Sequence, residues 1–295
     1  MFAPFGHLVT AMVTPFDNEG KIAEDLVKGL VKRLLGTGTE TILVGGTTGE
    51  SPTLAESELL GLIDLVRAEA GGKAKIIAGT GTNSTDKSVK LSKKAAKKGI
   101  DGILVVNPYY NKPTQAGLEA HFAAVANAVD MPVLLYNIPG RTAVNCEPET
   151  MARLSKTGNI VGVKEAAGSV EQAAQICSLT DRDEFALYSG DDVLTLPMLS
   201  VGGVGVVSVA SHLVGGKIRE MIESYFRGET EKSRDIHLSL LPLFKALFCR
   251  TNPIPLKYAL NRIGTSVGGH RLPLVPLDDA GRGIVDAALK HAGLI

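Results

Sequence analysis

The chain has 295 residues, of which 44% are hydrophobic and 21% are charged, so it is long and apolar enough to build one large core. Its 31 Lys and Arg residues balance its 31 Asp and Glu residues. This balance provides no general positive surface for nucleic acid or anionic lipid, and we expect neither as a partner.

The N-terminus and the cysteines narrow the class of protein further. Residues 1–14 lack the cationic start, apolar core and small-residue cleavage site of a secretory signal, and no apolar run approaches a membrane span. These features predict a soluble cytoplasmic protein. Cys146, Cys177 and Cys249 are widely spaced and the six histidines form no paired motif, so we expect buried free thiols and no metal site.

Aliphatic runs alternate with amphipathic segments along most of the chain. The runs predicted as strands are residues 8–13, 41–44, 75–79, 102–106, 132–137, 160–164, 185–189 and 203–207. Helical patterns between them cover residues 24–35, 54–70, 85–98, 115–128, 147–154, 170–178 and 192–199. Because parallel strands need long crossover connections, eight such units predict an α/β protein with a (β/α)₈ barrel.

Beyond Val209 only helical patterns follow, at residues 217–226, 229–248, 255–261 and 278–291. The first of these is predicted to complete the barrel. We therefore expect a barrel catalytic domain at residues 1–226 and a C-terminal helical domain at residues 227–295. Packing or support of an oligomer is the expected structural role of the second domain.

Polar residues collect where the predicted strands end, which is where barrels of this kind hold their chemistry. The strand ends continue into GGTTGES at residues 45–51, NPYYN at 107–111, YNIPGRT at 136–142, KE at 164–165, SGDD at 189–192 and VS at 207–208. Three of the six tyrosines lie in these segments. One amine, one guanidinium, several hydroxyls and a glycine-rich turn should therefore surround one mouth.

Lys164 ends the short apolar run at residues 160–164, so its amine is expected at the rim of an apolar interior. Burial disfavours the charged form of an amine, and a neutral lysine can attack a carbonyl carbon to form a Schiff base. The ordinary alternative is a lysine whose amine reaches solvent from the strand end.

Schiff-base chemistry needs proton transfer, which weak hydroxyl acids can supply. Tyr136 and Thr47 are suited to this role, with Tyr110 passing protons towards solvent. The backbone of Thr47, Thr48 and Gly49 offers donors for a substrate carboxylate, and Arg141 could bind a second carboxylate through two hydrogen bonds. A phosphate-binding or merely tight turn remains the alternative for GGTTGES, and packing at the barrel rim for each tyrosine.

The segments GGTTGES, NPYYNKPTQAG, YNIPGRT and GVKEAAG resemble the signatures of the dihydrodipicolinate synthases, within the N-acetylneuraminate lyase superfamily of pyruvate-dependent class I aldolases. The resemblance extends over nearly the whole chain. It implies that Lys164 forms the Schiff base with pyruvate and that Tyr136 donates and accepts protons. Thr47 and Tyr110 would complete a relay, with Tyr110 supplied by a neighbouring subunit.

The same resemblance implies the substrate contacts and the reaction. Thr48 and the backbone of Val207 correspond to pyruvate contacts, and Arg141 to the residue that holds the carboxylate of the aldehyde. The implied reaction condenses pyruvate with L-aspartate 4-semialdehyde on the route to diaminopimelate and lysine. It needs no metal or diffusible cofactor, and the family is usually a homotetramer built from two dimers.

Two alternatives stay open at the level of sequence. Another pyruvate-dependent aldolase, such as a sugar-acid lyase, would share Lys164 but differ in its aldehyde, although the Gly140-Arg141-Thr142 segment favours a small carboxylated one. A non-catalytic barrel that binds a keto acid would keep Lys164 protonated and unreactive.

Feedback by lysine is expected to be weak or absent. Lysine-inhibited members of the family often carry histidines after the GES segment and an acidic residue in the helix after the third strand. This chain has Glu56 and Leu59 at the first place and Lys87 at the second. A cationic Lys87 repels an ammonium group where an anion would attract it.

Overall fold

The computed structural model describes residues 2–295. Its centre is a closed barrel of eight parallel strands, each bonded to the next in sequence, and the last strand pairs with the first. The strands are β1 (Leu8–Ala11), β2 (Thr41–Val44), β3 (Lys75–Gly79), β4 (Gly102–Val106), β5 (Val133–Asn137), β6 (Ile160–Glu165), β7 (Ala186–Ser189) and β8 (Gly205–Ser208). The predicted (β/α)₈ fold is confirmed.

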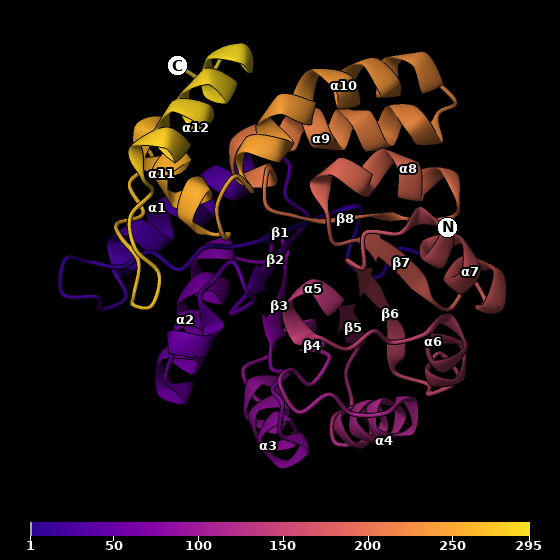
Figure 1. Ribbon diagram of the computed structural model, residues 1–295. Helices are drawn as coiled ribbons and strands as arrows, with labels where there is room; N and C mark the ends of the chain where they lie inside the picture. Colours follow the sequence, from indigo (N-terminus) through magenta and orange to yellow (C-terminus); the bar gives the residue numbers. More distant parts are fainter. Residues whose placement is uncertain (1) are drawn as a thin grey trace.

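Helices surround the barrel and continue beyond it (Figure 1). They are α1 (Glu24–Gly36), α2 (Glu56–Ala70), α3 (Thr85–Ala96), α4 (Gln115–Ala126), α5 (Pro139–Thr142), α6 (Pro148–Leu154), α7 (Val170–Leu179), α8 (Thr195–Ser200), α9 (Ser211–Phe226), α10 (Thr230–Ala246), α11 (Ile254–Arg262) and α12 (Asp279–His291). Short 3₁₀ turns, η1 (Ser51–Thr53) and η2 (Asp192–Leu194), precede α2 and α8.

Three helical segments differ from the sequence-based expectation. The short α5 was not predicted, and the helix expected at residues 192–199 is divided into η2 and α8. Helix α9 begins six residues earlier than expected and contains a kink at Val214. Gly215 follows this kink, and a Cβ there would lie 2.6 Å from the carbonyl oxygen of Thr37, so the glycine allows close packing at the end of α1.

The apolar residues form two layers, one inside the barrel and one between the strands and the helices. The inner cluster comprises Phe5, Val9, Ala11, Leu43, Ile77, Leu104, Leu134, Tyr136, Ala186, Tyr188, Val204 and Val207. The outer layer is larger and contains the buried faces of the helices. Side chains alternate along a strand, so Tyr136 faces inward and its neighbour Asn137 faces the helices.

The C-terminal helices pack against the barrel through α9, which lies alongside α10 in Figure 1. A buried ion pair joins them to the loop after β2, with Lys257 Nζ 2.6 Å from a carboxylate oxygen of Glu50. Lys257 and Arg271 also lie over the ring of Phe16, at 4.4 and 4.5 Å from its centroid. The boundary expected at residue 226 falls between α9 and α10 and stays a prediction.

The Lys257→Met variant is expected to lower the free energy of unfolding by about 3–5 kcal/mol, because it leaves the Glu50 carboxylate buried without its partner. Both side chains of the pair are 1% exposed or less. Urea unfolding measures the loss. Lys21→Met is the matched control: its pair with Glu19 is largely exposed and should contribute at most about 1 kcal/mol. Equal losses in the two variants would contradict the prediction.

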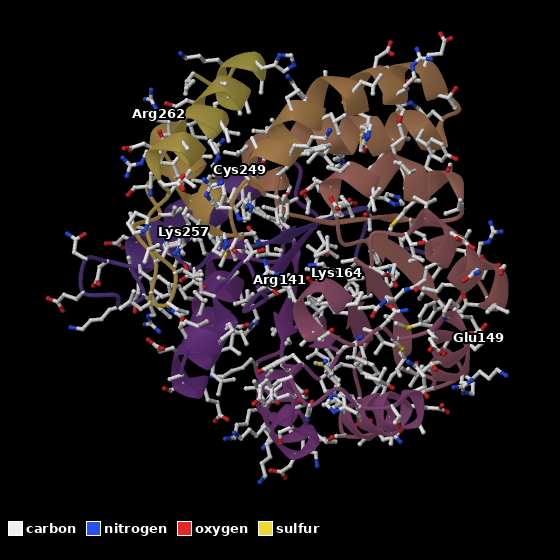
Figure 2. All side chains as sticks on the ribbon, in the orientation of Figure 1. Arg141, Glu149, Lys164, Cys249, Lys257 and Arg262 are labelled. Atoms are coloured by element: carbon white, nitrogen blue, oxygen red, sulfur yellow. The ribbon has the colours of Figure 1, made fainter. Side chains whose placement is uncertain are left out.

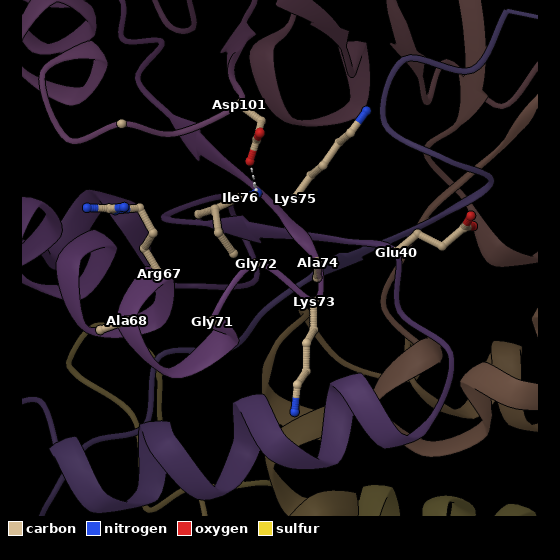
Figure 3. Close-up of a pocket in the computed structure, with 11 residues that line it drawn as sticks. Glu40, Arg67, Ala68, Gly71, Gly72, Lys73, Ala74, Lys75, Ile76 and Asp101 are labelled. Atoms are coloured by element: carbon tan, nitrogen blue, oxygen red, sulfur yellow. Dashed lines mark hydrogen bonds between the residues drawn. The ribbon is translucent and has the colours of Figure 1, made fainter.

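A hollow of 610 Å³ lies at the amino ends of the strands (Figure 3). Two of its charged side chains bond to the backbone: Asp101 accepts the N–H of Ile76 at 2.7 Å, and Lys75 Nζ donates to the carbonyl of Pro4 at 2.6 Å. These contacts close the floor of the barrel. The residues expected to carry chemistry lie at the opposite end.

Candidate active site

Lys164 projects into the barrel near its carboxyl-terminal mouth. Only 5% of its surface is exposed, so the side chain does not extend into solvent, as the ordinary alternative requires. The strand register places Lys164 beside Tyr136, and Lys164 Nζ lies 4.1 Å from the centroid of the Tyr136 ring. Strand β6 continues one residue further than predicted, to Glu165. An amine and a phenol thus meet within an apolar interior.

The lack of a side chain at Gly190 leaves space for the Lys164 side chain. A Cβ at this position would lie 3.2 Å from Lys164 Cε and 2.7 Å from the Cβ of Ala166. The N–H of Gly190 donates to the carbonyl of Glu165 at 2.7 Å, which ties the end of β7 to β6. No local sequence pattern indicates this role of Gly190, because only the packing reveals the close approach.

The GGTTGES turn supplies fewer free donors than expected. The N–H of Gly49 donates to the carbonyl of Gly46 at 3.0 Å, so the expectation that Gly49 offers a donor to a carboxylate is wrong. Within residues 2–295, the N–H groups of Thr47 and Thr48 have no hydrogen-bond partner. These two groups remain able to bind an anion.

Asn252 links two of the expected substrate-binding residues, although it comes from the segment before α11. Its side-chain amide donates to Thr48 Oγ1 at 2.9 Å, and its backbone carbonyl accepts from the guanidinium of Arg141 at 3.4 Å. The motifs at the strand ends do not include the segment before α11. No local pattern indicates that it crosses to the barrel mouth.

A cavity of 740 Å³ opens at the carboxyl ends of β2, β3 and β4. Thr47, Tyr109 and Arg141 line it, together with Val106 and Ile138, which pack against the inner cluster that contains Tyr136. Neither Lys164 nor Tyr136 is part of the lining. In Figure 2, Arg141 and Lys164 both project over the middle of the barrel.

Tyr110 and Val207 occupy contrasting places. Tyr110 is 89% exposed and has a φ of 76°, and no hydrogen bond within residues 2–295 holds its hydroxyl. The expected relay of Tyr136, Thr47 and Tyr110 is therefore not assembled within one chain. Val207 is buried in β8, where it pairs with Val9 across the closure of the barrel.

Asp192 holds the end of β8 next to Val207. Its carboxylate accepts the N–H groups of Val209 and Ala210, each at 3.0 Å, and the hydroxyl of Ser208. Burial raises the pKa of this carboxyl group, and the three hydrogen bonds act in the opposite direction. These hydrogen bonds hold the backbone just after Val207, the residue expected to contact pyruvate.

A closed parallel barrel with a buried amine at the carboxyl ends of its strands has the form of an enzyme that acts on carbonyl compounds. The model of the "Dihydrodipicolinate synthetase family" matches residues 4–292. The chain belongs to this family.

No helix within residues 2–295 combines the length and apolar character needed to cross a membrane.

Relatives and solved structures agree over the full length. A Cyanothece protein named 4-hydroxy-tetrahydrodipicolinate synthase is 53% identical over 99% of both chains. A Desulforudis audaxviator protein of the same name is 48% identical over 100% of both. The dihydrodipicolinate synthase structure from Cyanidioschyzon merolae "with lysine bound" has a TM-score of 0.97 and 47% identity over 100% of both chains. The Thermotoga maritima structure has a TM-score of 0.97, with 44% identity over 99% of this chain and 100% of that one.

Proposed function

We propose that this chain condenses pyruvate with L-aspartate 4-semialdehyde, the 4-hydroxy-tetrahydrodipicolinate synthase reaction, through a Schiff base on Lys164. The observation that carries the proposal is the buried amine of Lys164 against the ring of Tyr136. The activity is that of a lyase of the class I aldolase type. It is the activity for which the relatives at 48–53% identity are named.

The first half of the reaction uses the amine as nucleophile. Lys164 Nζ attacks the ketone carbon of pyruvate, and the resulting carbinolamine loses water to form an imine. In this proposal Tyr136, whose ring centroid lies 4.1 Å from Lys164 Nζ, moves protons to and from the departing oxygen. The N–H groups of Thr47 and Thr48 supply donors for the pyruvate carboxylate.

The second half forms a carbon–carbon bond. Loss of a proton from the methyl group of the imine gives an enamine, whose carbon attacks the aldehyde carbon of the second substrate. Tyr136 supplies the proton that the new alkoxide takes up. The amino group of the substrate then attacks the imine carbon, closes the ring and releases Lys164 as a free amine. The lysine itself accepts the electron pair, so no diffusible cofactor enters.

Arg141 selects the aldehyde. Its guanidinium lies at the wall of the cavity and suits the carboxylate of a small aldehyde, since it can donate two parallel hydrogen bonds. We therefore favour aspartate semialdehyde over a polyol substrate.

The test compares turnover of two substrates by the purified protein. Condensation of pyruvate with aspartate semialdehyde should be faster than cleavage of N-acetylneuraminate by at least several orders of magnitude. The reverse ranking would identify a sugar-acid lyase. Absence of both activities, together with no pyruvyl adduct after borohydride reduction, would identify a keto-acid-binding barrel.

We also propose that the active form is an oligomer, a tetramer of paired dimers, in which Tyr110 enters the site of a neighbouring subunit. The support is the exposure of Tyr110 and its strained backbone. Mixing an inactive Lys164→Ala variant with a Tyr110→Phe variant should restore activity, because mixed dimers contain one complete site. Sedimentation of the wild-type protein measures the size of the assembly.

The cytoplasmic location stays a prediction, which cell fractionation would check.

Inhibition by lysine is expected to be weak, since Lys87 lines the cavity with Glu56 and Leu59. Within residues 2–295 Lys87 forms no ion pair, whereas the Glu56 carboxylate is paired with Lys94 at 2.5 Å. The unpaired charge repels the lysine side chain. Initial rates across a lysine series measure the effect, and Lys87→Glu should strengthen inhibition. A low-micromolar midpoint for the wild-type protein would refute the prediction.

A further inference from the structure

Glu165 follows Lys164 in β6 and faces the opposite way, towards the helices. Its side chain is fully buried. The strand register pairs Tyr136 with Lys164 and, one step further along, Asn137 with Glu165. The two residues expected to perform the chemistry are thus each followed by a polar residue on the outer face of the barrel.

The Glu165 carboxylate accepts hydrogen bonds from three sides. Asn137 Nδ2 donates to both carboxylate oxygens, at 3.2 and 3.0 Å. The N–H of Ala167 donates at 2.7 Å, and Gln172 Nε2 on α7 donates at 3.2 Å. The carboxylate therefore ties β5, the loop after β6 and α7 to one point behind Lys164.

The orientation of the Asn137 amide is fixed by the backbone. The N–H of Cys146 donates to Asn137 Oδ1 at 3.0 Å, so the oxygen faces Cys146 and the nitrogen faces Glu165. Asn107, at the end of β4, donates to the same Oδ1 at 2.8 Å and to the carbonyl of Val144 at 3.2 Å. Three neighbouring strand ends, β4, β5 and β6, are joined in this way.

We propose that Glu165 is a positioning residue for the reaction, which holds the ends of β5 and β6 in register so that Lys164 and Tyr136 keep their contact inside the barrel. This inference rests on the proposed function. Glu165 touches neither substrate, because its side chain lies outside the ring of strands. It acts through Asn137, whose backbone continues directly from Tyr136.

The network requires an anion at this position. All groups that face the carboxylate oxygens are donors, and a glutamine would turn its own NH₂ group towards one of them. Burial raises the pKa of Glu165, and the hydrogen bonds from Asn137, Ala167 and Gln172 act in the opposite direction.

The test measures the Glu165→Gln variant against Glu40→Gln, in the full-length protein below its unfolding temperature. Glu40 accepts the N–H groups of His7 and Leu8, at 2.8 and 2.9 Å, at the other end of the barrel. We expect Glu165→Gln to lower kcat and the rate of borohydride trapping of pyruvate by up to about 10²-fold, because small misplacements of reacting groups are costly. KM for aspartate semialdehyde should change little, and Glu40→Gln should keep wild-type trapping.

A second variant keeps the inference open to refutation if Glu165→Gln does not fold. Gln172→Ala removes only one donor to the carboxylate and should slow trapping in the same direction by a smaller factor. Wild-type trapping rates in the folded variants would overturn the inference while leaving the proposed function intact. A wild-type protein that traps no pyruvate would overturn the proposed function, and this inference with it.

Discussion

The Lys164→Met variant is expected to lose turnover by about 10³-fold or more and to form no covalent adduct with pyruvate. Methionine keeps the length and apolar contacts of the lysine stem but removes the nucleophilic nitrogen. Borohydride reduction in the presence of pyruvate, followed by mass spectrometry of peptides, measures the adduct directly. In the wild-type protein, the adduct should be found on the peptide that contains Lys164.

Lys257 provides an internal control for this experiment. It is as deeply buried as Lys164, but its amine is paired with the Glu50 carboxylate at 2.6 Å. Burial lowers the pKa of Lys257, while Glu50 favours its charged form. A paired ammonium has no lone pair for attack, so the peptide of Lys257 should stay unmodified. An adduct on Lys257, or full activity of Lys164→Met, would contradict the assignment.

The barrel could be predicted because its strands have an unusually simple composition. Strands covered on both faces are nearly continuous aliphatic runs, as in residues 102–106, and β2, β3 and β4 match their predicted bounds. Helix bounds were less certain where the local pattern competed with tertiary contacts. The helix expected from residue 217 begins at Ser211 and includes Gly215, where Thr37 packs closely.

The site could be predicted as a set of strand ends, and the contacts among them could not. The position of Lys164 at the end of an apolar run predicts a buried amine, and the structure places it against Tyr136. Asn252 is more than two hundred residues from Thr48 in the sequence. No local pattern indicates that the two side chains form a hydrogen bond. The roles of Gly190 and of Glu165 likewise emerge only from packing between strands.

The Tyr136→Phe variant is expected to lower kcat by about 10²–10⁴-fold, because the phenol is the proposed proton donor and acceptor beside the imine. Pyruvate trapping should persist, at a reduced rate, since the nucleophile at Lys164 is still present. The free energy of unfolding should change little. Within residues 2–295 the Tyr136 hydroxyl forms no hydrogen bond, so phenylalanine retains the packing of the ring.

Tyr188→Phe separates this catalytic effect from the loss of any buried phenol. Tyr188 lies in the same inner cluster, but its hydroxyl accepts the N–H of Phe5 at 3.1 Å, and burial raises its pKa. Removing that hydroxyl leaves a buried N–H unpaired and should cost about 1–3 kcal/mol of stability while kcat is retained. The two variants should therefore show opposite patterns in steady-state kinetics and urea unfolding. If Tyr136→Phe resembles Tyr188→Phe, proton transfer at the imine belongs to another group.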